Sequence, residues 1–143
     1  MNKVNFSQAV KAGALAAVVA VVINSILFFI FHQASVISDT VFIEPNKPLT
    51  VMPVIISSTL PSILASIVFF FFEKFTKNGF RNFTILSIIL GLLSLVSPFM
   101  VLKEAPIGYA LALNLMHVVV IAAILFFINR AVNNKVSYSL SNN

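Results

Sequence analysis

Four long apolar runs divide the chain, and no Asp, Glu, Lys or Arg interrupts any of them. They cover residues 12–31, 51–72, 83–102 and 107–128. A transmembrane α-helix needs roughly 20 apolar residues to cross about 30 Å of hydrocarbon, because each residue adds about 1.5 Å. The pattern therefore predicts an all-α membrane protein, a four-transmembrane-helix bundle that forms a single membrane domain over residues 1–143.

The connections between the runs differ in length and character. The first one, from His32 to Leu49, is long, and its residues 41–43 (Val-Phe-Ile) favour an extended conformation. Pro45 and Pro48 follow within the same loop. We expect an extended segment that lies over the outer mouth of the bundle. The C-terminal tail, residues 133–143, is polar, and we expect it to be disordered.

The first apolar run has a second interpretation, a cleaved signal peptide, because Lys3 and Lys11 precede it. Its apolar stretch is longer than the usual 7–15 residues of a signal peptide. His32 and Gln33 occupy the positions where a small-residue cleavage motif would be needed. We therefore expect the run to remain as a membrane span.

Lysine and arginine predict the orientation, since both are enriched in cytoplasmic connections. One side of the predicted bundle carries seven of them and the other side two. The seven are Lys3, Lys11, Lys74, Lys77, Arg81, Arg130 and Lys135, and the two are Lys47 and Lys103. The sequence thus predicts both termini on the cytoplasmic side (N-in/C-in) and the long first loop outside, in a plasma membrane such as a bacterial inner membrane.

Composition agrees with a lipid environment. The chain is 59% hydrophobic and 9% charged, with a mean hydropathy of +1.04, whereas about a quarter of the residues of a soluble domain are charged. The net charge of +5 comes from basic residues at the ends of apolar runs, so it does not indicate nucleic-acid binding. The absence of cysteine excludes disulfides, thiol catalysis and thiolate-bound metals.

Each apolar run carries one stripe of small or polar residues, and such stripes mark the faces on which membrane helices pack. The stripes are Ala12, Ala16, Ala20 and Asn24; Ser58, Ser62 and Ser66; Ser87, Gly91 and Ser94; and Ala110, Asn114 and His117. A four-helix bundle in which neighbouring helices share these faces follows from the pattern.

Polar side chains concentrate in the outer half of the spans. Asn24 and Asn114 both lie about 10 Å below the outer boundary, and His117 lies one turn deeper. Pro61 and Pro98 fall in the same layer and can kink their helices, unless the third helix already loosens before Pro98. We therefore expect a small outward-facing polar cavity. Its candidate lining residues are Asn24, Ser58, Ser62, Ser94, Asn114 and His117. We also expect Asn24, Asn114 and His117 to form one hydrogen-bonded cluster.

His117 is the only titratable side chain deep within a span, which makes it a candidate functional residue. Three roles stay open for it: a structural hydrogen bond, contact with a ligand, and proton relay. No carboxylate lies in a span to support the relay. The second histidine, His32, belongs near the outer surface, and two ligands do not complete a zinc site. We expect no metal and no cofactor.

Membrane enzymes and transporters of known types need residues that the spans lack. An intramembrane protease needs a nucleophile motif with its base, paired aspartates or a zinc motif. Small multidrug transporters also have four helices, but they depend on a membrane-embedded glutamate, and Glu73 stands at the edge of its span. We therefore expect no enzymatic activity, with a membrane enzyme using His117 kept as the least favoured hypothesis.

Three segments of the spans resemble a known group. They are the first helix with Asn24, Ser58-Thr59-Leu60-Pro61 in the second, and Leu113-Asn114-Leu115-Met116-His117 in the fourth. Over about residues 8 to 130 the chain resembles small bacterial inner-membrane proteins that form a domain family of unknown function. The resemblance implies a four-helix fold and carries no activity.

Two functions remain in view beside the enzyme. The first is a non-enzymatic accessory or binding protein whose outer cavity holds a lipid-like ligand or a partner helix. The second is a small oligomeric transporter or channel. The expected partners are the lipid bilayer, a lipid-like ligand or another membrane protein, and a second copy of the chain is left open.

Overall fold

The computed structural model describes residues 3–44, 47–101 and 105–141. These residues form the helices α1 (Phe6–Gln33), α2 (Val51–Phe75), α3 (Gly79–Ser94), α4 (Ser97–Val101) and α5 (Ile107–Ser141). Two short antiparallel strands lie between α1 and α2, namely β1 (Phe42–Glu44) and β2 (Lys47–Pro48). In the described part of the chain, four helical segments are long and apolar enough to span a membrane. The prediction of an all-α, four-helix integral membrane protein is confirmed.

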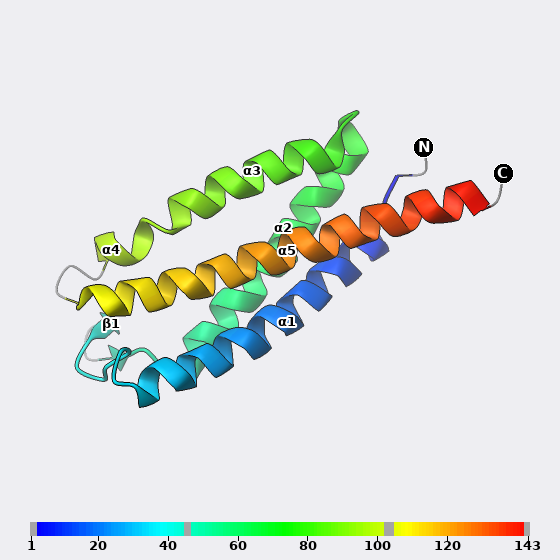
Figure 1. Ribbon diagram of the computed structural model, residues 1–143. Helices are drawn as coiled ribbons and strands as arrows, with labels where there is room; N and C mark the ends of the chain where they lie inside the picture. Colours follow the sequence, from blue (N-terminus) through cyan, green and yellow to red (C-terminus); the bar gives the residue numbers. More distant parts are fainter. Residues whose placement is uncertain (1–2, 45–46, 102–104, 142–143) are drawn as a thin grey trace.

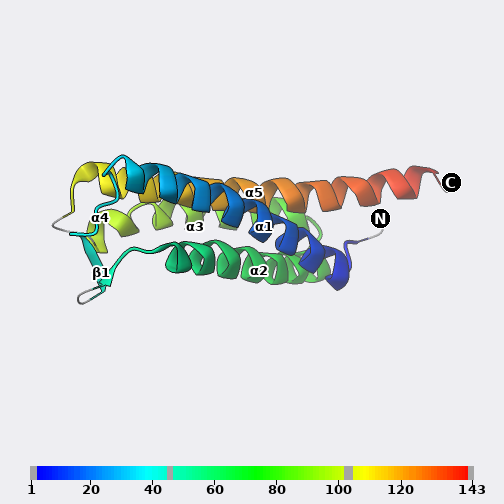
Figure 2. The same ribbon diagram turned by 90° about the horizontal axis from the view of Figure 1, so that it is seen from below.

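The helices form a ring in which α1 and α3 lie on opposite sides. α1 packs against α2 and α5, and α3 packs against the same two helices. Both termini and the α2–α3 turn lie at one end, called here the termini end (Figures 1 and 2). The strand β1, the helix α4 and the start of α5 lie at the opposite end, called here the hairpin end. The extended segment predicted in the first loop is present as β1 and β2.

Local hydrogen bonds fasten the start of α1 to the end of α2. Asn5 Oδ1 accepts from Gln8 N at 2.9 Å, and Gln8 Oε1 accepts from Asn5 N at 3.1 Å. This reciprocal pair is a capping box, which satisfies two N–H groups that a helix start leaves free. Lys3 Nζ donates to the carbonyls of Lys74 and Thr76. The first turn of α1 is therefore held against α2 at the termini end.

The predicted packing faces of the first two helices are confirmed. Every member of both stripes is buried: Ala12, Ala16, Ala20, Asn24, Ser58, Ser62 and Ser66. Side chains this small let two helix backbones approach closely. The two helices lie close together at Gly13, where an added Cβ would lie 2.5 Å from Ser66 Cβ and 2.9 Å from the Ser62 carbonyl oxygen.

The third and fourth predicted faces agree only in part. On α3, Gly91 is buried against Ile121, whereas Ser87 and Ser94 are partly exposed. On α5, Ala110 is buried, but Asn114 and His117 are only partly so. The main buried face of α5 instead includes Tyr109, Ala112, Met116, Val120 and Ala123. These residues recur at intervals of three and four, the period of one helix face.

The third apolar run, predicted over residues 83–102, is interrupted. α3 ends at Ser94, and α4 begins at Ser97. A proline at position 98 lacks an N–H and would clash with the Ser94 carbonyl in a continuous helix. The helix therefore loosens before Pro98, which is the exception that the sequence allowed.

Pro61, by contrast, stays inside α2. Hydroxyl side chains beside it bond to carbonyls one turn earlier, Ser62 Oγ to Ser58 O and Thr59 Oγ1 to Ile55 O, both at 2.8 Å. These bonds do not reach the Ser57 carbonyl, which is the one that Pro61 leaves without an N–H partner, and they add to the backbone bonds of the turns around it.

The end of the chain differs from the prediction of a disordered tail over residues 133–143. α5 continues as helix to Ser141, and residues 142–143 lie outside the described residues. No glycine or proline occurs between Ile128 and Ser141, so nothing in the backbone chemistry stops the helix there.

The helices α2 and α3 diverge from their shared turn toward the hairpin end (Figure 1). Near the turn they are joined by buried aromatic rings, Phe69 and Phe83, whose centroids are 5.4 Å apart. At the hairpin end α4 packs against α5. In this half of the bundle α3 therefore lies further from α2 than it does near the turn (Figure 1).

The orientation of the bundle in the membrane remains a prediction. The basic residues of the N-terminus, the α2–α3 turn and α5 share the termini end, whereas Lys103 lies outside the described residues. We expect a cysteine at Ser38 to react with an impermeant maleimide in intact cells, because Ser38 lies in the loop at the hairpin end. A cysteine at Asn78, in the α2–α3 turn, should react only after permeabilisation. If only the cysteine at position 78 reacted in intact cells, the bundle would have the opposite orientation to the predicted one.

Candidate binding site

Asn24 is the residue at which three helices meet. Its side chain is 1% exposed. The amide Nδ2 donates to Ser58 Oγ on α2 at 3.0 Å and to the Met116 carbonyl on α5 at 3.1 Å. The alanine stripe below Asn24 brings α1 close enough to both neighbours for these bonds to form. Asn24 therefore connects α1 to α2 and to α5.

The other polar atom of Asn24 is left unpaired. Among the described residues, three buried side-chain oxygens have no hydrogen-bond partner: Asn24 Oδ1, Tyr109 Oη and Asn114 Oδ1. Both amide hydrogens of Asn24 are already used, so rotating the side chain cannot pair its oxygen without breaking those bonds. A buried acceptor of this kind indicates a place where a further donor belongs.

A cavity of about 220 Å³ lies beside Asn24, between α2 and α5. Its polar lining comes from Asn24, Ser57, Ser58 and His117. Its apolar lining comes from Leu49, Pro53, Val54, Leu113, Met116 and Val120. An apolar cavity of about 150 Å³ is enough for benzene, whereas pockets for drug-sized ligands reach about 300–1,000 Å³. The space therefore suits a slender group rather than a large ring system.

The structure gathers three of the six predicted cavity residues, Asn24, Ser58 and His117, around this space. Ser62 is buried and bonds to the Ser58 carbonyl of its own helix. Ser94 bonds to the Gly91 carbonyl within α3 at 2.7 Å. Asn114 and Ser94 do not line the cavity.

Asn24, Asn114 and His117 do not form the expected hydrogen-bonded cluster in the described part of the chain. In the described part of the chain, the partners of Asn24 are Ser58 and Met116, and no hydrogen bond joins Asn24 to Asn114 or to His117. Asn24 and His117 nevertheless share the lining of one cavity. Ser58 Oγ accepts its hydrogen bond from Asn24 Nδ2, and no hydrogen bond between Ser58 and His117 is present among the described residues.

Two contributors were missed by the sequence-based reasoning. The Met116 carbonyl is a backbone acceptor, which no side-chain pattern reveals. Tyr109 is fully buried with its hydroxyl unpaired, and it was not among the candidate residues. The interval of seven residues between Tyr109 and Met116 is the one signal in the sequence that places both on one helix face.

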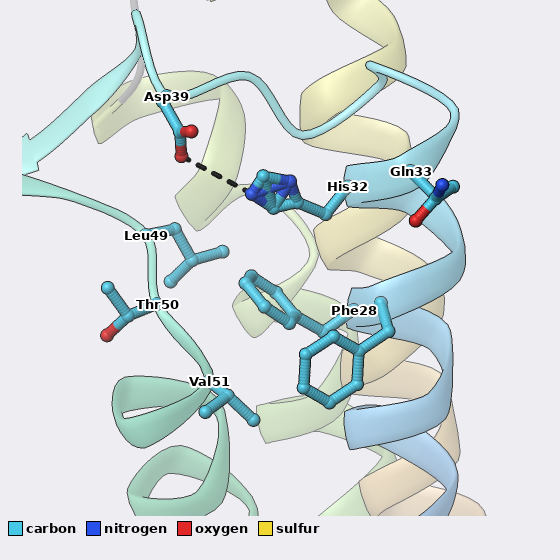
Figure 3. Close-up of a pocket in the computed structure, with 8 residues that line it drawn as sticks. Phe28, His32, Gln33, Asp39, Leu49, Thr50 and Val51 are labelled. Atoms are coloured by element: carbon cyan, nitrogen blue, oxygen red, sulfur yellow. Dashed lines mark ion pairs between the residues drawn. The ribbon is translucent and has the colours of Figure 1, made fainter.

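A second cavity, of about 410 Å³, lies at the hairpin end between the end of α1 and the start of α2 (Figure 3). At its rim, His32 Nε2 lies 3.5 Å from Asp39 Oδ1. The side chain of His32 is 39% exposed and that of Asp39 is 69% exposed. An ion pair this exposed contributes little to stability. Phe28 and Val51 form part of its apolar lining, and Leu49 lines both cavities. The described residues contain no group of three or more side chains that could hold a metal ion.

The model of DUF6069, a family of unknown function, matches residues 4–134, which include all four spans. Comparison with curated proteins and with solved structures found no match.

Proposed function

The chain belongs to this family of unknown function, and from that premise we propose that it is a non-enzymatic membrane protein that binds a lipid-like molecule beside Asn24. The observation that carries the proposal is Asn24 Oδ1, an unpaired buried acceptor on a residue that lines the cavity. Leaving such an oxygen without a donor costs about 1–3 kcal/mol. A ligand with an O–H or N–H group would recover this free energy.

The cavity walls support the choice of ligand class. Apolar side chains such as Val54 and Leu113 surround a few polar atoms, which suits a hydrocarbon chain that ends in a hydroxyl or an amide. No charged side chain, among the described residues, lines the space, so a fully charged head group would find no partner.

The first test uses 1-decanol as the probe and decane as its matched control. We expect 1-decanol to raise the melting temperature of the purified protein in a mild detergent, because its hydroxyl can donate to Asn24 Oδ1. Decane has the same chain without the donor and should have a much smaller effect. A probe at 100 times its dissociation constant stabilises the folded state by about 2.7 kcal/mol. Equal effects of the two probes, or none from 1-decanol, would contradict the proposal.

A pair of variants locates the effect. Ser57→Phe places a ring in the cavity from the exposed side of α2, and it leaves the bonds of Asn24 intact. We expect it to abolish the shift with 1-decanol. Ser94→Phe makes the same chemical change on α3, outside the cavity, and should retain the shift. Loss of the shift in both variants would show that the alcohol acts elsewhere.

A further inference from the structure

A third cavity lies at the termini end, far along the bundle from Asn24. It has a volume of about 280 Å³ and is formed between α1 and α5. Lys11 and Leu15 contribute from α1, and Phe127 and Arg130 from α5. Gln8 and Asn134 complete its polar rim. This combination of two cations, two amides and an apolar floor has no part in the function proposed above.

The two cations of this cavity have no anionic partner in the described part of the chain. Both Lys11 and Arg130 are exposed, and neither makes a hydrogen bond or an ion pair there. No carboxylate lines the cavity. The nearby acid of the termini end, Glu73, instead accepts from the backbone N–H of Val4 at 3.4 Å. The cavity is therefore a site of uncompensated positive charge.

The amide groups of the rim add hydrogen-bond donors. The Oε1 atom of Gln8 is held by the N–H of Asn5 in the capping box, at 3.1 Å. The same side chain therefore keeps its Nε2 group free to donate to a ligand. Asn134 is exposed on the opposite side of the cavity, on α5. Guanidinium, ammonium and amide donors together match the oxygens of a phosphate ester.

The level of this cavity in the membrane indicates what kind of molecule it can bind. Lys11 directly precedes the first apolar run, and Arg130 lies just beyond the last one, so both charges belong at the level of the lipid head groups. Leu15 and Phe127 lie about one turn further into the hydrocarbon. Basic pockets between transmembrane helices bind anionic head groups. We propose that this cavity binds an anionic phospholipid of the leaflet at the termini end, with its phosphate between Lys11 and Arg130 and an acyl chain against Leu15 and Phe127.

The test compares phosphatidylglycerol with phosphatidylcholine and inorganic phosphate, each titrated against the purified protein in a neutral detergent. Binding is followed by native mass spectrometry and by the melting temperature. We expect phosphatidylglycerol to bind and phosphatidylcholine to bind far more weakly. Inorganic phosphate lacks the acyl chain that the apolar floor recognises, so it should not raise the melting temperature at equal concentration. Equal binding of both lipids, or a full effect of phosphate alone, would overturn the proposal.

Variants separate this cavity from general attraction to basic residues. Each basic residue near an anionic lipid surface contributes about fivefold to affinity. The double variant Lys11→Gln/Arg130→Gln should therefore weaken phosphatidylglycerol binding by about 25-fold. The control Lys77→Gln/Arg81→Gln removes the same charge from the α2–α3 turn at the same end and should change binding little. Similar weakening in both pairs would show that only the overall charge matters, and would contradict a specific site.

A second measurement keeps every charge in place, so it does not depend on how well the variants fold. A photoreactive amino acid at Leu15 should crosslink phosphatidylglycerol in preference to phosphatidylcholine. The same group at Leu111, which is similarly exposed but near the hairpin end, should show no preference. A lack of preference at Leu15 would overturn the proposal. Neither result bears on the Asn24 cavity, because that cavity is formed by other residues.

Discussion

Gly13→Leu is expected to lower the stability of the detergent-solubilised protein more than any other substitution proposed here. An added Cβ at Gly13 would lie 2.5 Å from Ser66 Cβ and Oγ and 2.9 Å from the Ser62 carbonyl oxygen. The carbonyl belongs to the backbone, so relief requires α1 and α2 to move apart. Overpacking costs about 1–3 kcal/mol even where side chains can adjust. We expect a loss of at least about 3 kcal/mol, measured by thermal unfolding in one detergent.

Two matched substitutions calibrate this result. An added Cβ at Gly91 meets Ile121 Cδ1 at 2.7 Å, and that atom is the tip of a flexible side chain. Gly91→Leu should therefore cost less than Gly13→Leu. Ala122 is exposed on α5, and Ala122→Leu should have little effect. Equal losses at all three positions would contradict the packing faces described above.

Replacing Asn24 should have the second largest effect. Asn24→Ala removes two hydrogen bonds, one to Ser58 and one to Met116. Hydrogen bonds between membrane helices contribute about 0.6 kcal/mol on average and at most about 1.7 kcal/mol. The substitution should therefore lower the free energy of unfolding by about 1–3 kcal/mol, and the lost packing of a buried side chain adds to this.

A double-mutant cycle identifies the partner. Asn24→Ala and Ser58→Ala should be non-additive, because the second substitution removes a bond that the first has already broken. Asn24→Ala and Asn114→Ala should be nearly additive, since no hydrogen bond joins these residues in the described part of the chain. Additivity in the first pair with coupling in the second would favour the cluster expected from the sequence.

The sequence predicts the number of spans and the packing stripes of the first two helices because these depend on local chemistry. Charge-free runs of about 20 residues can satisfy their backbone in lipid only as helices. Ala16 and Ser62 are buried as predicted, because small residues mark close contacts whichever helices meet. The break before Pro98 is also local, and the sequence anticipates it as an alternative.

The site is predicted only in part because the sequence determines how deep a side chain lies in the membrane but not which way it points. The depth of Asn24, Asn114 and His117 follows from the rise per residue. Whether a side chain points at a neighbouring helix depends on how the helices are rotated and crossed, which no single helix determines. Asn114 therefore matches Asn24 in depth and yet does not bond to it. Ser94 shows another limit, since its hydroxyl bonds to its own backbone at Gly91 rather than across the bundle.

The thin packing of α3 has a consequence for how the bundle is assembled. α3 buries only Gly79, Phe83 and Gly91, and it touches α2 and α5 but not the main face of α1. The well-packed part of the bundle is therefore formed by α1, α2 and α5. The helix α3 is peripheral, and we expect its local unfolding to cost less free energy than that of the other three helices. Of these three helices, α5 comes last in the chain. The bond from Asn24 to Met116, 92 residues later, can form only after α5 has been synthesised, so we expect α1 and α2 to pair before α5 joins them.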